Sequence, residues 1–287
     1  MQGNRPKISL ILESFTQLEK AYKDLRKNLS LGREEFLSNR LLQDRVRVDF
    51  NLAFESCMRV CRHISAVYQI RTTSRDCLEK IGEFVGVEEG QSFGTLVDFY
   101  IKHRDLKETL PPEELYDFLS NHLNLLRDYA KAVVEFIKRE TKNPLLIDFD
   151  LLKEKAGRVK ESVKKINFVL SQGEEEFCKR AMYYDRVKYF YHVAYDSLFD
   201  ICKHLAPKFG IKSFGDDCLI RMLEAGLISP EHKEALSHMV SLKNKLINIW
   251  DIPQQELYKS LSEIKEKFEP ILKDISQSLR RLLEKLQ

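Results

Sequence analysis

The sequence predicts an all-α protein made of two tandem up-and-down bundles of four or five helices each. Apolar residues recur at helical spacing in nearly every segment, and no stretch shows sustained strand alternation. The chain also contains one pattern twice, because residues 32–64 align without a gap on residues 173–205, an offset of 141. Short turns between helices favour antiparallel neighbours. We therefore expect two helical domains, 1–142 and 143–287, that pair as an intrachain pseudo-dimer.

The first helix of each copy is predicted from apolar residues that recur every three or four positions. These residues are Leu18, Tyr22, Leu25 and Leu29 in the first copy, and Val159, Val163, Ile166 and Leu170 in the second. A single long helix then follows in each copy, at about 34–68 and about 174–206. The boundary between the domains is expected at Asn143, since the residue before a proline is disfavoured in a helix.

The remaining helices are predicted from residues that favour helix starts. Asp76 and Asp217 are placed to cap a short helix that holds Cys77 in one copy and Cys218 in the other. Further helix starts are expected at residues 90–92 and 229–231. The final helix of each copy opens at 111–114 and 253–256, where a proline in the first turn has no donor to lose.

Composition is that of an ordinary globular protein, with 43% apolar residues, 32% charged residues and a formal charge of +3. No apolar run is long enough to span a bilayer and no signal peptide is evident, so we expect a cytoplasmic protein with no membrane contact. The six cysteines lack metal-ligand spacing. Cys57 and Cys61, four residues apart, are expected to be buried thiols in a reducing compartment.

No motif for binding a cofactor or a metal is present, so we expect the protein to bind neither a cofactor nor a metal. A Gly-x-Ser-x-Gly match at residues 90–94 has no preceding strand, so Ser92 is interpreted as a helix cap and not as a nucleophile.

Both copies resemble the HepT-type HEPN proteins, which are the toxin half of a toxin–antitoxin pair. In the first copy the resemblance is carried by LSLGREEFLSNRLLQDRV (29–46), NLAFESCMRVCRHI (51–64) and TLVDFYIKHRDLKETLPPEELYDFL (95–119). The second copy has LSQGEEEFCKRAMYYDRV (170–187), HVAYDSLFDICKHL (192–205) and HMVSLKNKLINIWDIPQQELYKSL (238–261). The resemblance implies a helical bundle that dimerises, with two motifs facing one cleft where RNA is cut without a metal. It also implies a small nucleotidyltransferase antitoxin as partner.

The family motif reads Arg-Asn-x-x-x-His-x-Tyr, and this chain departs from it in both copies. In the second copy the four positions hold Lys243, Asn244, Asn248 and Trp250. Aligning residues 96–97 with 239–240 gives Tyr100, Ile101, Asp105 and Lys107 in the first copy. Metal-free cleavage needs a proton-transfer group near the 2′-hydroxyl and a cation for the phosphate. Neither copy keeps the histidine or the tyrosine that the antitoxin modifies, so we expect no catalysis at Tyr100, Asp105, Lys243 or Asn248.

Other basic and aromatic side chains gather around the motif positions. The candidates for RNA or partner binding are Lys102, His103, Arg104, Lys107, Asn244, Lys245 and Trp250. His103 and Arg104 are expected to be an exposed pair, while His63 and His204 are expected to cap or line the bundles. Arg186 and His192 lie six positions apart on one helix, or about 600° around its axis, so they are not expected to share a phosphate.

The sequence therefore favours a catalytically degenerate HepT-like protein that binds a partner or RNA at the cleft between its domains without cutting it. Two alternatives stay open. One is an active ribonuclease toxin that uses a divergent set such as His103, Arg104 and Lys243. The other is a purely structural interaction module, with a nucleotidyltransferase as one candidate partner.

Overall fold

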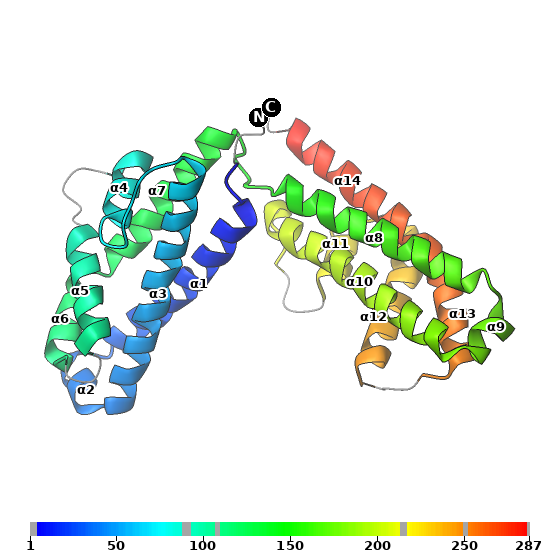
Figure 1. The fold of residues 1–287 in the computed structure, drawn as a ribbon, viewed down its shortest axis with the longest axis horizontal. Helices are drawn as coiled ribbons and strands as arrows, with labels where there is room; N and C mark the ends of the chain where they lie inside the picture. The colour runs from blue at the N-terminus through cyan, green and yellow to red at the C-terminus, as the bar shows by residue number, and fades with distance from the viewer. Residues whose placement is uncertain (1–4, 88–92, 107–109, 213–216, 249–251, 286–287) are drawn as a thin grey trace. The chain divides into compact units, whose positions relative to one another are not determined.

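The structure is a computed structural model that describes residues 5–87, 93–106, 110–212, 217–248 and 252–285. Every regular element in these ranges is a helix, which confirms the all-α prediction (Figure 1). The chain divides into two compact units, Met1–Leu146 and Ile147–Gln287, whose relative placement is not determined. The pairing of the two into a pseudo-dimer stays a prediction.

The first unit contains seven α-helices in its described part, so the prediction of four or five helices for each bundle is wrong. They are α1 (Ile8–Leu29), α2 (Arg33–Ser38), α3 (Arg40–Val67), α4 (Cys77–Val85), α5 (Phe93–Leu106), α6 (Pro112–His122) and α7 (Asn124–Thr141). The long helix α3 packs along α1, and α4 and α7 pack against α3. Apolar faces at helical spacing on these elements form one buried core.

The second unit repeats this order among its described residues. Its helices are α8 (Phe149–Leu170), α9 (Glu174–Lys179), α10 (Ala181–Leu205), α11 (Cys218–Glu224), α12 (Lys233–Asn248), α13 (Gln254–Ile264) and α14 (Phe268–Glu284). Short 3₁₀ turns join them at Ala206–Phe209, Pro230–His232 and Lys265–Lys267. The long helix α10 packs along α8 as α3 packs along α1. The predicted helix start at 229–231 is confirmed as the turn that leads into α12.

The predicted single helices at 34–68 and 174–206 are wrong in one respect, because each is broken near its start. Asn39 leaves the helical region with φ −113° and ψ 93°, and Arg180 does the same with φ −114° and ψ 101°. The side chain of Asn39 accepts a hydrogen bond from the backbone N–H of Leu42 and so starts a new helix. The short helix before each break carries one buried phenylalanine, Phe36 or Phe177.

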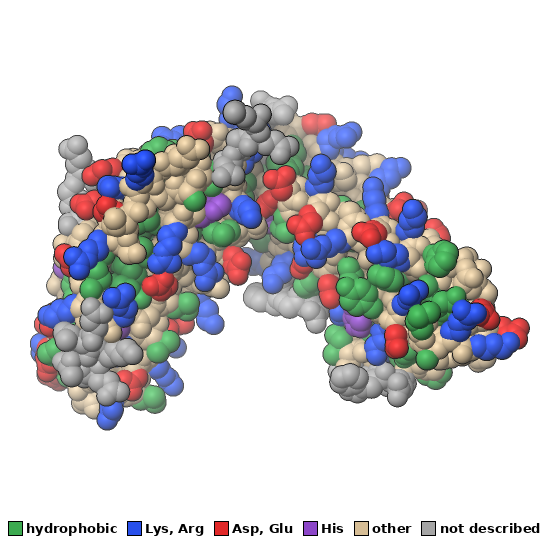
Figure 2. All heavy atoms as spheres, in the orientation of Figure 1, with side chains coloured by type: hydrophobic (Ala, Val, Ile, Leu, Met, Phe, Trp, Pro, Cys, Tyr) green, Lys and Arg blue, Asp and Glu red, His purple; other side chains and the backbone are tan. Residues whose placement is uncertain are grey.

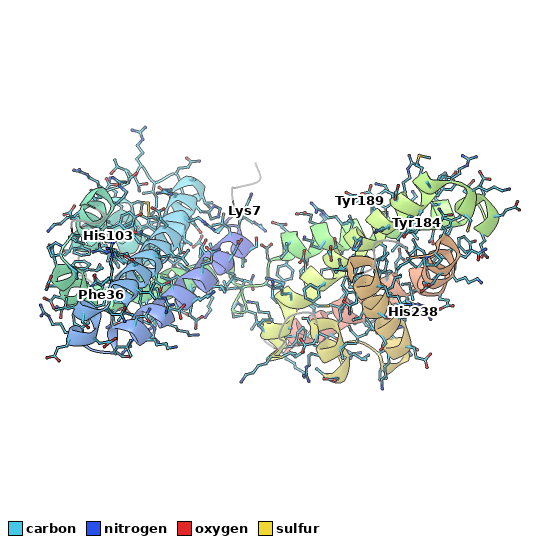
Figure 3. All side chains as sticks on the ribbon, turned by 90° about the horizontal axis from the view of Figure 1, so that it is seen from below. Lys7, Phe36, His103, Tyr184, Tyr189 and His238 are labelled. Carbon is cyan, nitrogen blue, oxygen red and sulfur yellow. A yellow bond between two sulfur atoms is a disulfide. The ribbon has the colours of Figure 1, made fainter. Side chains whose placement is uncertain are left out.

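Those two phenylalanines hold the broken segment against the rest of each unit. Phe36, labelled in Figure 3, contacts the ring of Tyr116 with centroids 5.4 Å apart. Phe177 contacts Tyr258 at the same distance. The tyrosine hydroxyl in turn donates to the carbonyl of Leu29 in one unit and of Leu170 in the other. A glycine with positive φ precedes each short helix, where a side chain would be strained.

The equivalent histidines His63 and His204 tie down the chain just before the first helix of each unit. The backbone N–H of Lys7 donates to Nε2 of His63 at 2.8 Å, and that of Asp148 donates to Nε2 of His204 at 2.9 Å. Both imidazoles therefore satisfy a backbone donor near a helix start, in agreement with the predicted capping role.

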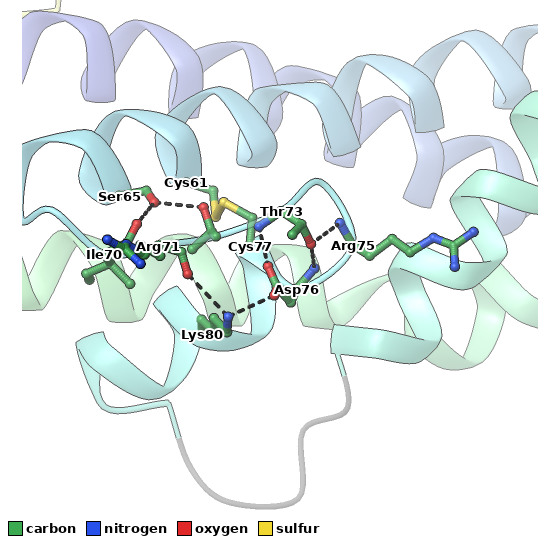
Figure 4. A network of polar contacts seen from close by, with 10 residues as sticks. Cys61, Ser65, Ile70, Arg71, Thr73, Arg75, Asp76, Cys77 and Lys80 are labelled. Atoms are coloured by element: carbon green, nitrogen blue, oxygen red, sulfur yellow. Dashed lines mark hydrogen bonds and ion pairs between the residues drawn. A yellow bond between two sulfur atoms is a disulfide. The ribbon is translucent and has the colours of Figure 1, made fainter.

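The prediction that Cys61 is a buried thiol is wrong, because Cys61 of α3 forms a disulfide with Cys77 of α4 (Figure 4). Cys57 is a buried thiol as expected, and burial raises its pKa. Structural disulfides are typical of oxidising compartments, so the bond gives no support to the expected reducing one, and the cytoplasmic location stays a prediction. In the second unit Cys202 and Cys218 occupy the same places on α10 and α11 and carry thiols.

The predicted cap at Asp76 is only partly correct. Asp76 stands at the N-cap position of α4, but its carboxylate accepts from the backbone N–H of Thr73 and pairs with Lys80 at 2.8 Å (Figure 4). It therefore orders the loop before the helix and pairs with a side chain of the first turn, but it does not cap the backbone N–H groups of that turn. Asp217 likewise makes no capping hydrogen bond and pairs with Arg221. The predicted start at 90–92, with Ser92, lies outside the described residues. None of the described helices is long and apolar enough to cross a bilayer.

Candidate functional site

The motif segments lie on α5 and α12, which occupy the same place in their units. At the first motif position, the hydroxyl of Tyr100 donates to Oε1 of Glu55 on α3 at 2.9 Å. Its counterpart Lys243 donates to Oδ1 of Asp196 on α10 at 2.7 Å. Glu55 and Asp196 are themselves equivalent at the offset of 141 residues. In each unit, the motif segment therefore faces the equivalent point of that unit's own long helix.

Lys243 is held by three side chains of α10. Besides the contact with Asp196, its ammonium lies 3.0 Å from Nδ1 of His192 and 5.5 Å from the ring centroid of Tyr195. Only 15% of the lysine side chain is exposed, so these contacts replace much of its hydration. An acid, an imidazole and an aromatic ring together stabilise the cation.

His192 is the residue that sequence reasoning missed. Partial burial and the neighbouring ammonium of Lys243 lower the pKa of His192, while Asp196 opposes that shift. The imidazole is therefore neutral at pH 7, and its Nδ1 accepts from Lys243, which leaves the proton on Nε2. The motif lysine has a histidine beside it after all, but from another helix. The available signal was the spacing of His192 and Asp196, which are four residues apart and share a helix face.

Tyr100 gives the first unit a neutral group at the same position. Burial and the hydrogen bond to Glu55 raise the pKa of Tyr100 to about 12, so the phenol keeps its proton. Its ring stacks on Phe54 with centroids 3.8 Å apart and an interplanar angle of 11°. Phe54 is the counterpart of Tyr195, so stacking in one unit replaces a cation–π contact in the other.

The nearby lysines also have equivalent partners. Lys102 pairs with Glu114, and Lys245 pairs with Glu256 at 2.7 Å. Each pair joins the motif helix to the helix that follows it, α6 or α13. Both are surface pairs, which contribute little to stability. Asn244 is exposed on α12.

The prediction that His103 and Arg104 form an exposed pair is wrong for the histidine. Arg104 is exposed, but His103 is only 3% exposed and lies edge-on to Phe50 with centroids 5.5 Å apart (Figure 3). Neither ring nitrogen has a hydrogen-bond partner among the described residues. Burial and the nearby Arg47 lower the pKa of His103 to about 4. A neutral, buried imidazole is not available to a substrate.

Four predicted site residues cannot be placed with their side chains. Asp105 and Asn248 lie within α5 and α12, and only their backbone is described. Lys107 and Trp250 lie outside the described residues.

The described residues hold no group of three or more His, Cys, Asp or Glu side chains that suits a metal ion. The side chains at the motif position comprise one partly buried cation, one neutral imidazole and a carboxylate in the second unit, and a neutral phenol in the first. In the second unit the charge of Lys243 is paired with Asp196, and in the first unit the phenol of Tyr100 already donates to Glu55, so an anion would have to displace an acid to bind at either position.

Comparison with known proteins gives one family. Residues 159–275, from α8 to α14, match the family model described as Ribonuclease HepT-like. No curated protein and no solved structure matches the chain. The matched segment includes the long helix α10 and the motif helix α12, and so contains His192, Asp196 and Lys243. Residues 159–275 of this chain are therefore similar to the HepT-like family.

Proposed function

We propose that this chain is a catalytically degenerate HepT-like protein that binds a partner protein or RNA and does not cleave RNA. One observation carries the proposal: in both units an acid of the long helix binds the side chain at the first motif position. Tyr100 has no charge to offer a phosphate, and the charge of Lys243 is already balanced by Asp196. Since the histidine of the motif is also replaced in both copies, the usual cation and the usual proton-transfer group are both missing.

We also propose that the two units are copies of one ancestral unit. The support is the repetition of contacts at equivalent positions. Four features recur in both units: the order of the helices, the break before each long helix, the aromatic pair at each short helix, and the hydrogen bond from a backbone N–H to a histidine. An unrelated pair of helical bundles would not share so many side-chain contacts at one sequence offset.

A ribonuclease activity is the second candidate, and the position of His192 favours it. A histidine and a lysine 3.0 Å apart could replace the histidine and arginine of the motif, with Lys243 facing the phosphate and His192 transferring a proton. His103, by contrast, is buried and offers no route to cleavage.

Incubation with RNA separates the two candidates. Wild type, His192→Ala and Lys243→Ala should all leave a single-stranded RNA intact in the presence of EDTA. Lys245→Ala is the matched control, since it removes a neighbouring cation that is paired with Glu256. Cleavage by wild type that both His192→Ala and Lys243→Ala abolish, and Lys245→Ala retains, would replace our proposal with the ribonuclease.

A protein partner is tested by co-purification from the native organism. We propose a nucleotidyltransferase as the partner, because the resemblance implies one. The tyrosine that such a partner would modify is replaced by Lys107 and Trp250. Mass spectrometry should therefore find the partner bound and those two positions unmodified. Recovery of the chain without any partner, combined with RNA binding, would leave RNA as its ligand.

A further inference from the structure

The second unit has an open groove between α8 and α10. The groove lies on a different face of α10 from the one that contacts Lys243 of α12. Its volume is about 530 Å³, and it is lined by Glu161, Lys164, Lys165, Phe168, Val169, Arg186 and Phe190. Figure 2 shows hydrophobic and basic side chains, with acidic ones among them, over these two helices. Arg186 faces this groove while His192 contacts α12, so the two point to different faces as predicted.

Aromatic rings are unusually exposed at this groove. Phe168 is 65% exposed, and Tyr189, which is labelled in Figure 3 and neighbours the lining residue Phe190, is 63% exposed. Tyr189 contacts Phe190 with ring centroids 5.3 Å apart, so three rings lie on or beside one surface. Exposing several aromatic rings to water is energetically unfavourable, and a ligand that covers the rings would remove this unfavourable free energy.

Cations alternate with these rings. The ammonium of Lys165 lies 4.9 Å from the ring centroid of Phe190 and pairs with Glu161 at 2.6 Å. That pair neutralises the one acid in the lining. Lys164 and Arg186 have no ion pair among the described residues, so the groove has two cations to offer an anionic ligand.

The equivalent groove of the first unit has a different chemistry. It lies between α1 and α3, has a volume of about 480 Å³ and is lined by Asp24, Lys27, Asn28, Asp44, Arg45, Val48 and Asp49. At the offset of 141 residues, Lys27 replaces Phe168, Asp49 replaces Phe190 and Asp24 replaces Lys165. The same helix pair packs without these rings in the first unit. The fold therefore does not require them, and their presence in the second unit points to a ligand.

We propose that the groove between α8 and α10 binds single-stranded nucleic acid, whose bases stack on Phe168 and Phe190 and whose phosphates contact Lys164 and Arg186. Exposed planar rings between cations are the arrangement that binds bases and a sugar-phosphate backbone together. A protein occupant would need acidic and apolar side chains in the same alternation, whereas any single strand carries both features at every nucleotide. The site is separate from the motif position and does not depend on the absence of cleavage there.

Fluorescence anisotropy with labelled 12-mers tests the proposal on the full chain. The probes are oligo(U) RNA, oligo(dT) DNA and a duplex of equal length. Wild type should bind one or both single strands and prefer them to the duplex. Phe168→Ala/Phe190→Ala should weaken that binding about tenfold or more, since each ring supports a stacked base. Lys27→Ala/Asp49→Ala changes the same two positions of the first unit and should bind as wild type.

Salt dependence provides a readout that a purely structural role would not change. Lys164→Ala/Arg186→Ala should reduce the slope of log K against log salt by about 1.4, for two phosphate contacts to a single strand.

Binding to RNA alone, to DNA alone or to both supports the site and identifies its strand. No single-strand binding by wild type, or unchanged binding by Phe168→Ala/Phe190→Ala, would overturn the proposal. Failure to bind oligonucleotides combined with loss of a co-purified protein in Phe168→Ala/Phe190→Ala would assign the groove to a protein instead. RNA binding lost in Lys243→Ala and retained in Phe168→Ala/Phe190→Ala would place the ligand at the motif.

Discussion

The two units share a framework of helices and differ in the side chains arranged on it. Phe36 and Phe177 make the same buried contact, and His63 and His204 accept the same backbone hydrogen bond. Yet Cys61 is in a disulfide where Cys202 carries a thiol, and the α1–α3 groove is acidic where the α8–α10 groove is aromatic and basic.

That difference teaches which positions the fold constrains. A buried residue contacts several neighbours at once, so a change in its volume leaves a cavity or an overlap. An exposed residue on the groove contacts few neighbouring residues, so it can be replaced by a residue of different chemistry without destabilising the fold. Positions where the two units have the same side chain therefore indicate residues that the fold requires. Positions where the side chains differ are those at which a ligand, a redox change or a change of pH can affect one unit alone.

The largest expected effect tests the shared core. Phe36→Ala and Phe177→Ala each remove a fully buried ring, so each should lower the free energy of unfolding of its own unit by about 3–5 kcal/mol. Hydrogen-exchange mass spectrometry reads the two units separately. The two losses should agree within about 1 kcal/mol. Loss of protection in only one variant would show that the two contacts are not equivalent.

The disulfide provides the next effect. It closes a loop with a sequence separation of 16, so its reduction should destabilise the first unit by about 2–4 kcal/mol and leave the second unchanged. Alkylation of the denatured chain without reductant should label four cysteines, and reductant should raise the count to the six in the sequence. Six labelled cysteines before reduction would contradict the bond.

His103 should make the first unit sensitive to acid. Its pKa in the folded state is about 4, below the ordinary value of 6.5, because burial disfavours the charged form. The folded unit therefore binds fewer protons than the unfolded one between these values. Stability is fully present above about pH 6.5 and is lost as pH falls toward 4, by about 2–3 kcal/mol.

The second unit supplies the control for that prediction. Its residue at the position of His103 is Leu246, which is buried and does not titrate. His103→Leu should remove the loss of stability between pH 6.5 and 4, as measured by urea unfolding at several pH values. An NMR titration of His103 with a midpoint near 6.5 would contradict the burial of its ring.

The smallest effect concerns the acidic groove. Partial burial and the nearby Asp24 raise the pKa of Asp49, so its ionised form at neutral pH destabilises the first unit, and the cost is relieved as pH falls through that raised pKa. Asp49→Asn should raise the free energy of unfolding at pH 7 by a few tenths of a kcal/mol, as measured by urea unfolding. The exposed Asp44 gives the matched control, Asp44→Asn, which should leave the value unchanged. A loss of stability in Asp49→Asn would reverse the assigned sign.

Much of the framework could be read from the sequence, because helical spacing and helix-start residues are local signals. The apolar spacing at Leu18 and Val159 predicted α1 and α8, and proline before 114 and 256 predicted the starts of α6 and α13. The prediction that these are the final helices was wrong, because α7 and α14 follow them. The breaks at Asn39 and Arg180 were missed, since neither residue is a strong helix breaker.

The site was harder to predict because its parts lie on different helices. The motif alignment identified Tyr100 and Lys243, but their partners Glu55, His192 and Asp196 lie 45 to 51 residues away on the long helices. The burial of His103 was likewise missed, because the charged residues beside it suggested an exposed face.

The sequence by itself determined the helical class, and it predicted the internal repeat and the replacement of the motif histidine, since each of these is read from residue identity and spacing along one chain. Only the tertiary structure decided which side chains meet. It placed His192 beside Lys243, joined Cys61 to Cys77, buried His103 and lined a groove with rings and cations from α8 and α10. The physical reason is that contacts between helices depend on which faces pack together, and packing is settled by the whole core and not by any local segment.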